Sequence, residues 1–388
     1  MSRIDEIIGH LRDVASHPKE AIEQFKKDTG KGAVGIIYVY GPEEIIHAAG
    51  YLPVGLWGGN LPISQARAYL PSYGCSLMQA VMELECSGAY DNLDAVIFCV
   101  PCDTLRCVSQ IWKGKAPSIT FAHPQNRKIA AANDFLAAEY DLIRSKLEKI
   151  LNVKIGDEAI ENSIEVYNEN RRTMRDFCDV AADHPEIIDP INRHAVIKAR
   201  FFMDKAKHTA LVKELVAELR KQPVKPWKGK RIVLTGIMAE PDGLLEEFKK
   251  QGFAIVGDDL AQESRQFRND VPSGRSPLYR LAKWWQNLDG CSLATDPNKP
   301  RGQMLIDLVN EQLADGVVIC MMKFCDPEEF DYPIYYPQLQ QAGIPNVQIE
   351  VDLELTSFGQ VSTRLETFAE LLNENAPPPE KDLVAVPG

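Results

Sequence analysis

The sequence predicts an α/β fold of two Rossmann-like (flavodoxin-like) domains with parallel sheets, joined by a helical connector and preceded by an N-terminal helix. Two stretches are alike, Asp94-Ala-Val-Ile-Phe-Cys-Val-Pro-Cys-Asp103 and Asp315-Gly-Val-Val-Ile-Cys-Met-Met-Lys-Phe-Cys-Asp326. Each begins with a short apolar, β-branched run, which is typical of a parallel strand buried on both faces. A strand–helix–strand pattern precedes each stretch and a proline-led strand follows it. The two halves of the chain therefore repeat one order of elements.

The first half opens with residues 1–30, an amphipathic helical segment that Thr29-Gly-Lys-Gly32 ends. Residues 31–125 follow as the first predicted α/β domain. Within this domain we expect strands at 33–40, 54–57, 94–99 and 116–121, and helices at 42–50, 76–87 and 103–112. Proline in its first turn and glycine at its end favour the first of these helices.

The middle of the chain, residues 126–224, has almost no strand pattern, but its apolar residues recur at helical spacing. We interpret it as a helical connector. Residues 225–375 are the second predicted α/β domain, with strands at 231–236 and 254–259, the strand after Asp315, and a strand at 344–349. We expect helices at 244–252 and 362–373. Residues 376–388 begin Ala-Pro-Pro-Pro-Glu and are predicted to be a flexible tail.

The composition excludes several classes of protein. The chain has 388 residues, of which 45% are hydrophobic and 25% charged, with a formal net charge of -12. This acidity argues against nucleic acid or an anionic membrane surface as a partner. No run approaches eighteen apolar residues, so no membrane-spanning segment is expected. Nine cysteines without a secretory signal indicate a reducing, cytoplasmic location.

The cysteines at the ends of the two look-alike strands are the strongest candidates for chemistry. Cys102 and Cys325 each stand where a buried strand meets a loop and an aspartate follows, and Cys75 lies in a turn. The carboxyl ends of parallel strands are where α/β sheets place ligands. Because side chains alternate along a strand, we expect Cys99 and Cys320 to face the core.

The residues themselves leave several interpretations of these thiols open. One is that they are ordinary buried cysteines. Cys99-Val-Pro-Cys102 matches a thioredoxin-like dithiol, and a zinc-stabilised scaffold is another interpretation. A further one is an iron–sulfur cluster held by Cys75, Cys102 and Cys325 in the cleft between the halves, with one iron left open.

Three charged residues are candidate supporting groups. Asp103 and Arg106 stand one helical turn apart, so they are expected to pair and to position the loop at Cys102. Arg265 follows the strand that ends at Asp259 and is expected to clamp a phosphate or carboxylate, or else to be a solvated surface residue. The seven histidines show no metal-binding spacing, and neither first strand is followed by a glycine-rich phosphate loop.

Over nearly its full length the chain resembles the 2-hydroxyacyl-CoA dehydratase and benzoyl-CoA reductase family, and most of all the smaller, beta subunit of the dehydratases. Four motifs carry the resemblance: Ser72-Tyr-Gly-Cys75, Pro101-Cys-Asp-Thr-Leu-Arg106, Asp258-Asp-Leu260 with Arg265 after it, and Met322-Lys-Phe-Cys-Asp-Pro-Glu-Glu-Phe-Asp-Tyr-Pro333. The resemblance implies a heterodimer with a homologous alpha subunit. It also implies a 4Fe-4S cluster on three cysteines, which correspond to Cys75, Cys102 and Cys325 in this sequence. Cys99, Cys107 and Cys320 lie close enough to replace one of them.

The family's chemistry is the elimination of water from an (R)-2-hydroxyacyl-CoA to give a 2-enoyl-CoA. The resemblance implies that a separate, ATP-hydrolysing iron–sulfur activator supplies one electron. The thioester then becomes a ketyl radical, which expels the 2-hydroxyl group and loses a β-proton. The alternative within the family is a subunit of an ATP-dependent benzoyl-CoA reductase. Outside it, the alternatives are a cytosolic thiol oxidoreductase based on Cys99 and Cys102 and a zinc-stabilised scaffold. The sequence does not identify the acyl group.

Overall fold

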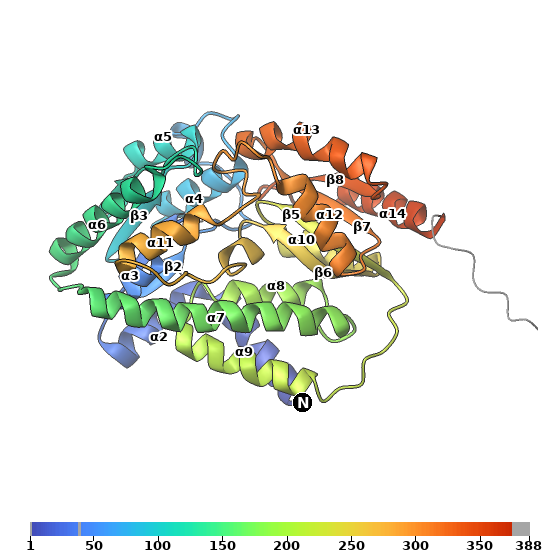
Figure 1. Cartoon of the computed structure of the whole chain (residues 1–388), viewed down its shortest axis with the longest axis horizontal. Coiled ribbons are helices and arrows are strands. Elements are labelled where there is room, and N and C mark those ends of the chain that lie inside the picture. Colours follow the sequence, from blue (N-terminus) through green and yellow to red (C-terminus); the bar gives the residue numbers. More distant parts are fainter. Residues whose placement is uncertain (1, 38–39, 375–388) are drawn as a thin grey trace, which may run out of the picture.

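The structure is a computed structural model that describes residues 2–37 and 40–374. It contains two four-stranded parallel sheets whose strands follow the same spatial order, β2-β1-β3-β4 and β6-β5-β7-β8. This confirms the predicted α/β class and the repeat of one half in the other. Figure 1 shows the two lobes side by side, with α7 passing beneath both.

The first sheet forms where the sequence places its buried apolar runs. Its strands are β1 (Ala33–Ile37), β2 (Leu52–Gly55), β3 (Ala95–Cys99) and β4 (Ser118–Phe121). The strand expected at 54–57 lies two residues earlier, because β2 pairs with β1 from Leu52 onward. Pro53 has no N–H to donate, and it is tolerated there because β2 is an edge strand that pairs with β1 alone. Residues 38 and 39 of the first expected strand lie outside the described residues.

The second sheet repeats the arrangement. Its strands are β5 (Lys230–Gly236), β6 (Phe253–Leu260), β7 (Gly316–Met322) and β8 (Asn346–Val351). In both sheets the strand order reverses beside the first strand, between β1 and β3 and between β5 and β7. Such a reversal leaves a crevice at the carboxyl ends of the strands, where doubly wound folds bind ligands.

Helices cover both sheets and link them. Those of the lobes are α3 (Glu43–Ala48), α4 (Ser76–Cys86), α5 (Asp103–Ile111), α10 (Asp242–Lys250), α11 (Pro277–Gln286), α12 (Arg301–Glu311), α13 (Asp326–Gln341) and α14 (Gly359–Glu374), with short 3-10 turns at Ala66–Ala68 and Ser264–Gln266. The middle of the chain forms α6 (Ala132–Leu151), α7 (Asp157–Asp183), α8 (Pro190–Ala199) and α9 (Lys205–Leu219). The expected helical character of the middle segment is therefore present.

The N-terminal segment consists of two helices, α1 (Arg3–Ser16) and α2 (Pro18–Thr29). They are separated at His17 because Pro18, which lacks an N–H, begins the second helix. The proline-rich stretch 376–388, predicted to be a tail, lies outside the described residues. No helix in the described ranges is long and apolar enough to cross a membrane.

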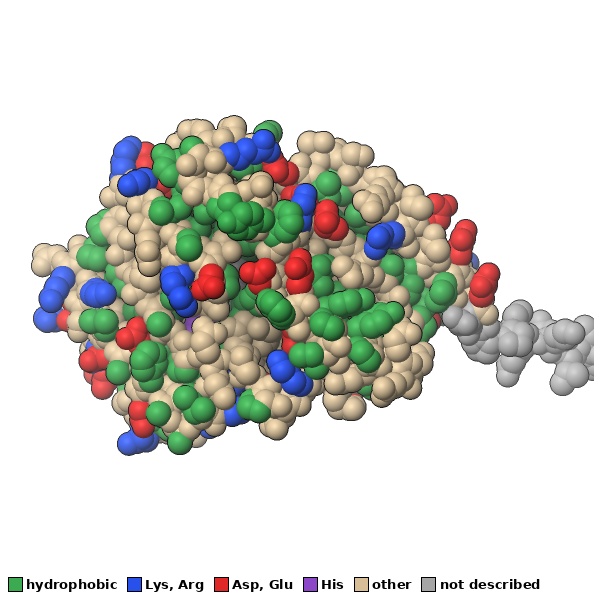
Figure 2. Space-filling view, turned by 90° about the horizontal axis from the view of Figure 1, so that it is seen from above, with side chains coloured by type: hydrophobic (Ala, Val, Ile, Leu, Met, Phe, Trp, Pro, Cys, Tyr) green, Lys and Arg blue, Asp and Glu red, His purple; other side chains and the backbone are tan. Residues whose placement is uncertain are grey.

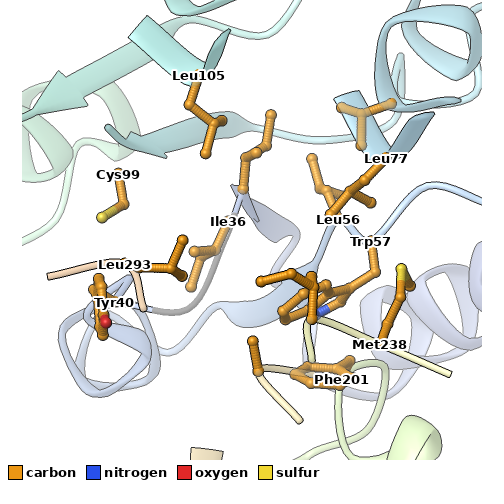
Figure 3. Packing of buried hydrophobic residues seen from close by; sticks show 14 of the residues in the cluster. Ile36, Tyr40, Leu56, Trp57, Leu77, Cys99, Leu105, Phe201, Met238 and Leu293 are labelled. Carbon is orange, nitrogen blue, oxygen red and sulfur yellow. The ribbon is translucent and has the colours of Figure 1, made fainter. Parts of the chain in front are cut away.

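The two lobes share a hydrophobic core. One continuous cluster of buried side chains runs from the first sheet to the second. Figure 3 shows members of this cluster from both halves, among them Ile36, Cys99 and Leu105 of the first lobe, Phe201 between α8 and α9, and Met238 and Leu293 of the second half. Helix α11, from the second half of the sequence, packs against α6 and α7. A site between the lobes is therefore held by shared packing rather than by a flexible linker.

A buried histidine also fastens the connecting helices to the second lobe. On α8, His194 contacts Glu263 through Nδ1 (2.8 Å) and Glu240 through Nε2 (3.0 Å). Burial alone lowers the pKa of His194, but the hydrogen bonds to these two glutamates outweigh it and raise that pKa to about 9. The imidazole is therefore charged in the folded chain at neutral pH.

This histidine should make stability fall as the pH rises. Because the pKa of His194 in the folded chain lies above its unfolded value of 6.5, its stabilisation is fully present below pH 6.5 and is lost as pH rises through about 9. The expected loss is on the order of 3 kcal/mol, since one unit of pKa shift corresponds to about 1.4 kcal/mol. Urea unfolding at pH 6.5, 8 and 9.5 measures it. In the variant His194→Gln, the free energy of unfolding should no longer fall between pH 6.5 and 9.5 by this amount. An equal fall in the variant and the unaltered chain would contradict the role given to His194.

Candidate functional site

Each of the three candidate cysteines stands at the start of a helix. Cys75 is the N-cap residue of α4, Cys102 of α5 and Cys325 of α13. Helix α5 follows β3 after a short turn and α13 follows β7 in the same way, so both thiols lie at carboxyl ends of central strands. The sequence predicted this placement from the two look-alike stretches.

The fold brings the three thiols into electrostatic contact with one another. Burial is the largest cause that raises the pKa of Cys75, to about 12, and the neighbouring Cys102 raises it further. Burial likewise raises the pKa of Cys325 well above its usual range, with additional contributions from Glu328, Cys75 and Cys102. Two thiols from the first lobe and one from the second therefore face one site.

Backbone N–H groups favour negative charge at all three sulfurs. The amides of Leu77 and Met78 act on Cys75, those of Thr104 and Leu105 on Cys102, and that of Glu328 on Cys325, each lowering the pKa of its thiol against the effect of burial. Helix N-termini carry partial positive charge, so three of them converge here on three sulfurs. Metal-bound cysteine is a thiolate, and this donor set fits an anionic thiolate cluster.

The cysteines named as alternatives lie elsewhere on the same elements. Cys99 on β3 and Cys320 on β7 are both fully buried, as predicted from strand alternation. Burial raises the pKa of each well above the usual range. Cys107 is exposed on α5.

The geometry does not favour the other two interpretations of the thiols, a reactive dithiol and a zinc site. A reactive dithiol needs a thiol with a lowered pKa, whereas burial raises the pKa of both Cys99 and Cys102. Within the part of the chain that the structure describes, no three His, Cys, Asp or Glu side chains are grouped so that they could hold one metal ion. A polynuclear cluster differs because its thiolates bind separate irons and stand further apart.

Asp103 and Arg106 form the expected pair, with Asp103 Oδ1 3.3 Å from Arg106 Nη1. Both side chains are exposed, at 85% and 58%. Exposed ion pairs contribute little to stability, typically less than about 1 kcal/mol. The pair lies on the first turn of α5 beside Cys102, which is compatible with the predicted positioning role.

Arg265 corrects the expectation of a ligand clamp or a solvated surface group. Its side chain is 1% exposed and binds Asp259 through Nε and Nη2, each at 3.0 Å. Asp259 also accepts from Arg301 Nε at 3.0 Å and from Arg268. Burial would raise the pKa of Asp259, but these guanidinium groups hold it well below its usual range. The arginine is therefore committed to a buried ion pair.

This arginine–carboxylate network (Asp259, Arg265, Arg268, Arg301, Glu328 and Asp331) reaches the thiol site. Arg301 Nη2 binds Glu328 Oε2 at 2.9 Å, and Nη1 binds Asp331 Oδ2 at 3.0 Å. Glu328 lies in the first turn of α13, and its charge is the largest contribution after burial to the raised pKa of Cys325. The network thus orients the helix that carries Cys325. Sequence reasoning included Glu328 only as one residue of the motif 322–333 and missed Arg301, because no local pattern links residues this far apart.

A second buried group that sequence reasoning missed surrounds Cys291. Its Sγ lies 2.6 Å from the Tyr40 hydroxyl and 3.6 Å from Arg265 Nη1, and its carbonyl accepts from Arg127. Nothing in the sequence around Cys291 resembles the look-alike strands. The contact between Tyr40 and Cys291 spans 251 residues and joins the two halves.

The molecular surface beside the thiols carries exposed aromatic side chains. Tyr73 and Phe330 are exposed by 73% and 79%, and Phe324 by 40%. Phe324 directly precedes Cys325 and has a positive φ of 60°, an uncommon conformation for a bulky residue. Figure 2 looks onto the molecule from above, where hydrophobic side chains lie among acidic and basic groups.

The fold and the site define a class: two-lobed, parallel α/β proteins with a thiol site between the lobes. The chain belongs to the family described as 2-hydroxyglutaryl-CoA dehydratase, D-component, whose match covers residues 38–372.

Named relatives match over almost the whole chain. It is 58% identical over 374 residues to the lactoyl-CoA dehydratase subunit beta of Anaerotignum propionicum, a match that covers 96% of this chain and all of that protein. Identity is 40% over 375 residues with the (R)-phenyllactyl-CoA dehydratase beta subunit of Clostridium sporogenes, with coverage of 96% and 100%. A benzoyl-CoA reductase subunit of Thauera aromatica is 27% identical over 360 residues, with coverage of 90% and 93%. The predicted family is confirmed.

Proposed function

We propose that this chain is the beta subunit of a 2-hydroxyacyl-CoA dehydratase and holds a 4Fe-4S cluster on Cys75, Cys102 and Cys325. The placement of three thiols at three helix N-termini, two of them at the carboxyl ends of central parallel strands, is the observation that carries the proposal. In this role the chain acts with a homologous alpha subunit, as the names of the relatives suggest.

The proposed reaction is loss of water from an (R)-2-hydroxyacyl-CoA to give a 2-enoyl-CoA. It follows ATP-dependent one-electron activation by a separate iron–sulfur protein and proceeds by radical elimination. The cluster, when bound, supplies one-electron chemistry at low potential and one open iron. The chain's own residues would hold it: three thiolates as ligands, backbone amides that stabilise their charge, and Glu328 and Arg301 that fix α13. Nine free cysteines suit a reducing compartment, and we propose a cytoplasmic location.

The dehydratase is favoured over the benzoyl-CoA reductase by degree of identity, 58% and 40% against 27%. Lactoyl-CoA and phenyllactyl-CoA, named in the first two relatives, are the first substrates to assay.

The test begins with protein purified without oxygen. We expect a brown protein with about four irons per chain and an oxygen-sensitive absorption in the visible range. With its alpha subunit and activator, it should convert a 2-hydroxyacyl-CoA to the enoyl-CoA only when ATP is present. A colourless protein that keeps zinc would contradict the cluster. A cyclic diene from benzoyl-CoA, with no dehydration of any 2-hydroxyacyl-CoA, would contradict the reaction.

A further inference from the structure

Ser76 directly follows Cys75 at the start of α4 and joins the two lobes. Its side chain is buried, with 6% of the residue exposed. The Ser76 hydroxyl donates to Met322 Sδ, 3.1 Å away, and accepts from the Leu353 N–H at 3.3 Å. Met322 is the last residue of β7, and Leu353 follows β8. One hydroxyl group of the first lobe therefore contacts two segments of the second.

The bond to Met322 leads directly to Cys325. Met322 lies three residues before Cys325, whose N–H donates to the Met322 carbonyl at 3.0 Å. Between them, the Lys323 N–H donates to the Val351 carbonyl of β8 at 2.9 Å. The turn that carries Cys325 is thus fixed to the ends of β7 and β8. A shift of Met322 against the hydroxyl that it contacts would move Cys325 relative to Cys75.

The turn that carries Cys75 is fixed within the first lobe in a similar way. The buried amide of Gln79 donates through Nε2 to the Gly74 carbonyl at 2.6 Å. The N–H groups of Met78 and Gln79 donate to the Cys75 carbonyl at 3.0 and 3.1 Å. Each cysteine is therefore held firmly by its own lobe, and the separation between them depends on how the lobes meet.

A neighbouring contact between the lobes provides a comparison. Asn60, which follows β2 in the first lobe, donates through Nδ2 to the carbonyls of Leu353 (2.7 Å) and Leu355 (3.1 Å). Both bonds are with the loop after β8. Asn60 therefore holds the same loop as Ser76 and can serve as a matched control for the bond to Met322.

We propose that Ser76 is a positioning residue, which sets the separation of Cys75 from Cys325 through its bond to Met322 and thereby the environment of the cluster. The part that concerns the cluster rests on the proposed function, whereas the bond between the lobes does not. Groups behind a metal ligand orient that ligand and tune the metal. The potential of an iron–sulfur cluster depends on hydrogen bonds to its sulfurs and on its exposure to solvent, both of which change when the ligands move.

The first test concerns the bond itself and is valid whether or not the chain holds iron. In Ser76→Ala, the Leu353 N–H loses its acceptor, so hydrogen exchange at Leu353 should be about three- to tenfold faster, the effect of one lost hydrogen bond on local opening. Urea unfolding of Ser76→Ala, Met322→Leu and the double variant completes a cycle. Because both single changes break the same bond, the double variant should lose less stability than the two single losses added together.

The second test concerns the cluster, in full-length protein purified without oxygen. Ser76→Ala should keep its iron, because all three thiols remain. The electron paramagnetic resonance signal of its reduced cluster should be broadened and shifted, and the reduction potential should differ from that of the unaltered chain. Ser76→Thr, which retains a hydroxyl group, should restore both. Asn60→Ala should speed hydrogen exchange in the loop after β8 but leave the signal and the potential unchanged.

Circular dichroism and a thermal melt show whether each variant is folded. Should Ser76→Ala fail to fold, Met322→Leu removes the same bond from the other lobe at nearly the same side-chain volume. A signal and potential unchanged in folded Ser76→Ala or Met322→Leu would overturn the positioning role and leave the proposed function intact. So would an equal change in Asn60→Ala, or additive losses in the cycle. An unaltered chain that binds no iron would instead contradict the proposed function, and the positioning role with it.

Discussion

Replacing Cys325 by serine is expected to abolish iron binding. The proposed cluster has three protein ligands, and Cys325 is the one from the second lobe, at the start of α13. Its loss leaves two thiols on the first lobe and none opposite them. Changes around a metal ligand cost roughly 10–100-fold in affinity or activity, and removal of the ligand itself should cost more. Iron analysis of anaerobically purified protein and a dehydration assay with the alpha subunit and activator measure both effects.

Cys320→Ala is the control for that experiment. Cys320 lies on β7, five residues before Cys325, which follows the strand. Its side chain is fully buried and belongs to the hydrophobic core. We expect this variant to keep its iron and to lose only some stability, because a small apolar side chain replaces a buried thiol. Iron retained in Cys325→Ser, or lost in a folded Cys320→Ala, would require a different set of ligands.

Replacing Asp259 by asparagine is expected to destabilise the fold by roughly 3–5 kcal/mol, the usual result of breaking a buried ion pair from one side. Asp259 accepts from Arg265, Arg268 and Arg301, and two of these guanidinium groups are buried within the protein. An amide of the same shape keeps the volume but removes the charge that all three share. Urea unfolding followed by circular dichroism gives the change in the free energy of unfolding.

Asp103→Asn is the matched control for Asp259→Asn. It also removes a carboxylate that pairs with an arginine, but Asp103 and Arg106 are both exposed. The expected change is less than about 1 kcal/mol. A similar loss in the two variants would mean that the buried network contributes no more than a surface pair, and that α13 is oriented by other contacts.

The repeated halves could be predicted because parallel strands are buried on both faces and therefore appear as short apolar runs. The runs at Asp94 and Asp315 correspond to β3 and β7, the inner strands of the two sheets. The edge strand β2 was misplaced by two residues, since Pro53 interrupts the β-branched apolar pattern. The local sequence is enough to predict that a strand is present. The residues at which an edge strand begins and ends depend on its pairing with the neighbouring strand.

The three thiols could be predicted for the same reason, since each directly follows a recognisable element or turn. Their surroundings could not. Arg301 joins Thr235, 66 positions away in the sequence, and Tyr40 joins Cys291 across 251. Contacts of this kind are set by how elements distant in the sequence pack together, so no spacing in the sequence reveals them. Arg265 illustrates the limit: the sequence singled out the residue, but its burial beside Asp259 differs from the ligand clamp or solvated group that was expected.

The origin of the three thiols also bears on how the protein matures. Cys75 and Cys102 are synthesised well before Cys325. Cys325 directly follows β7, an inner strand of the second sheet. The second sheet cannot close before that strand has been synthesised. The proposed cluster could therefore be completed only after β7 and Cys325 have been synthesised and placed opposite the first lobe. Iron loading would then serve as a final check on assembly, marking chains whose two lobes have met correctly.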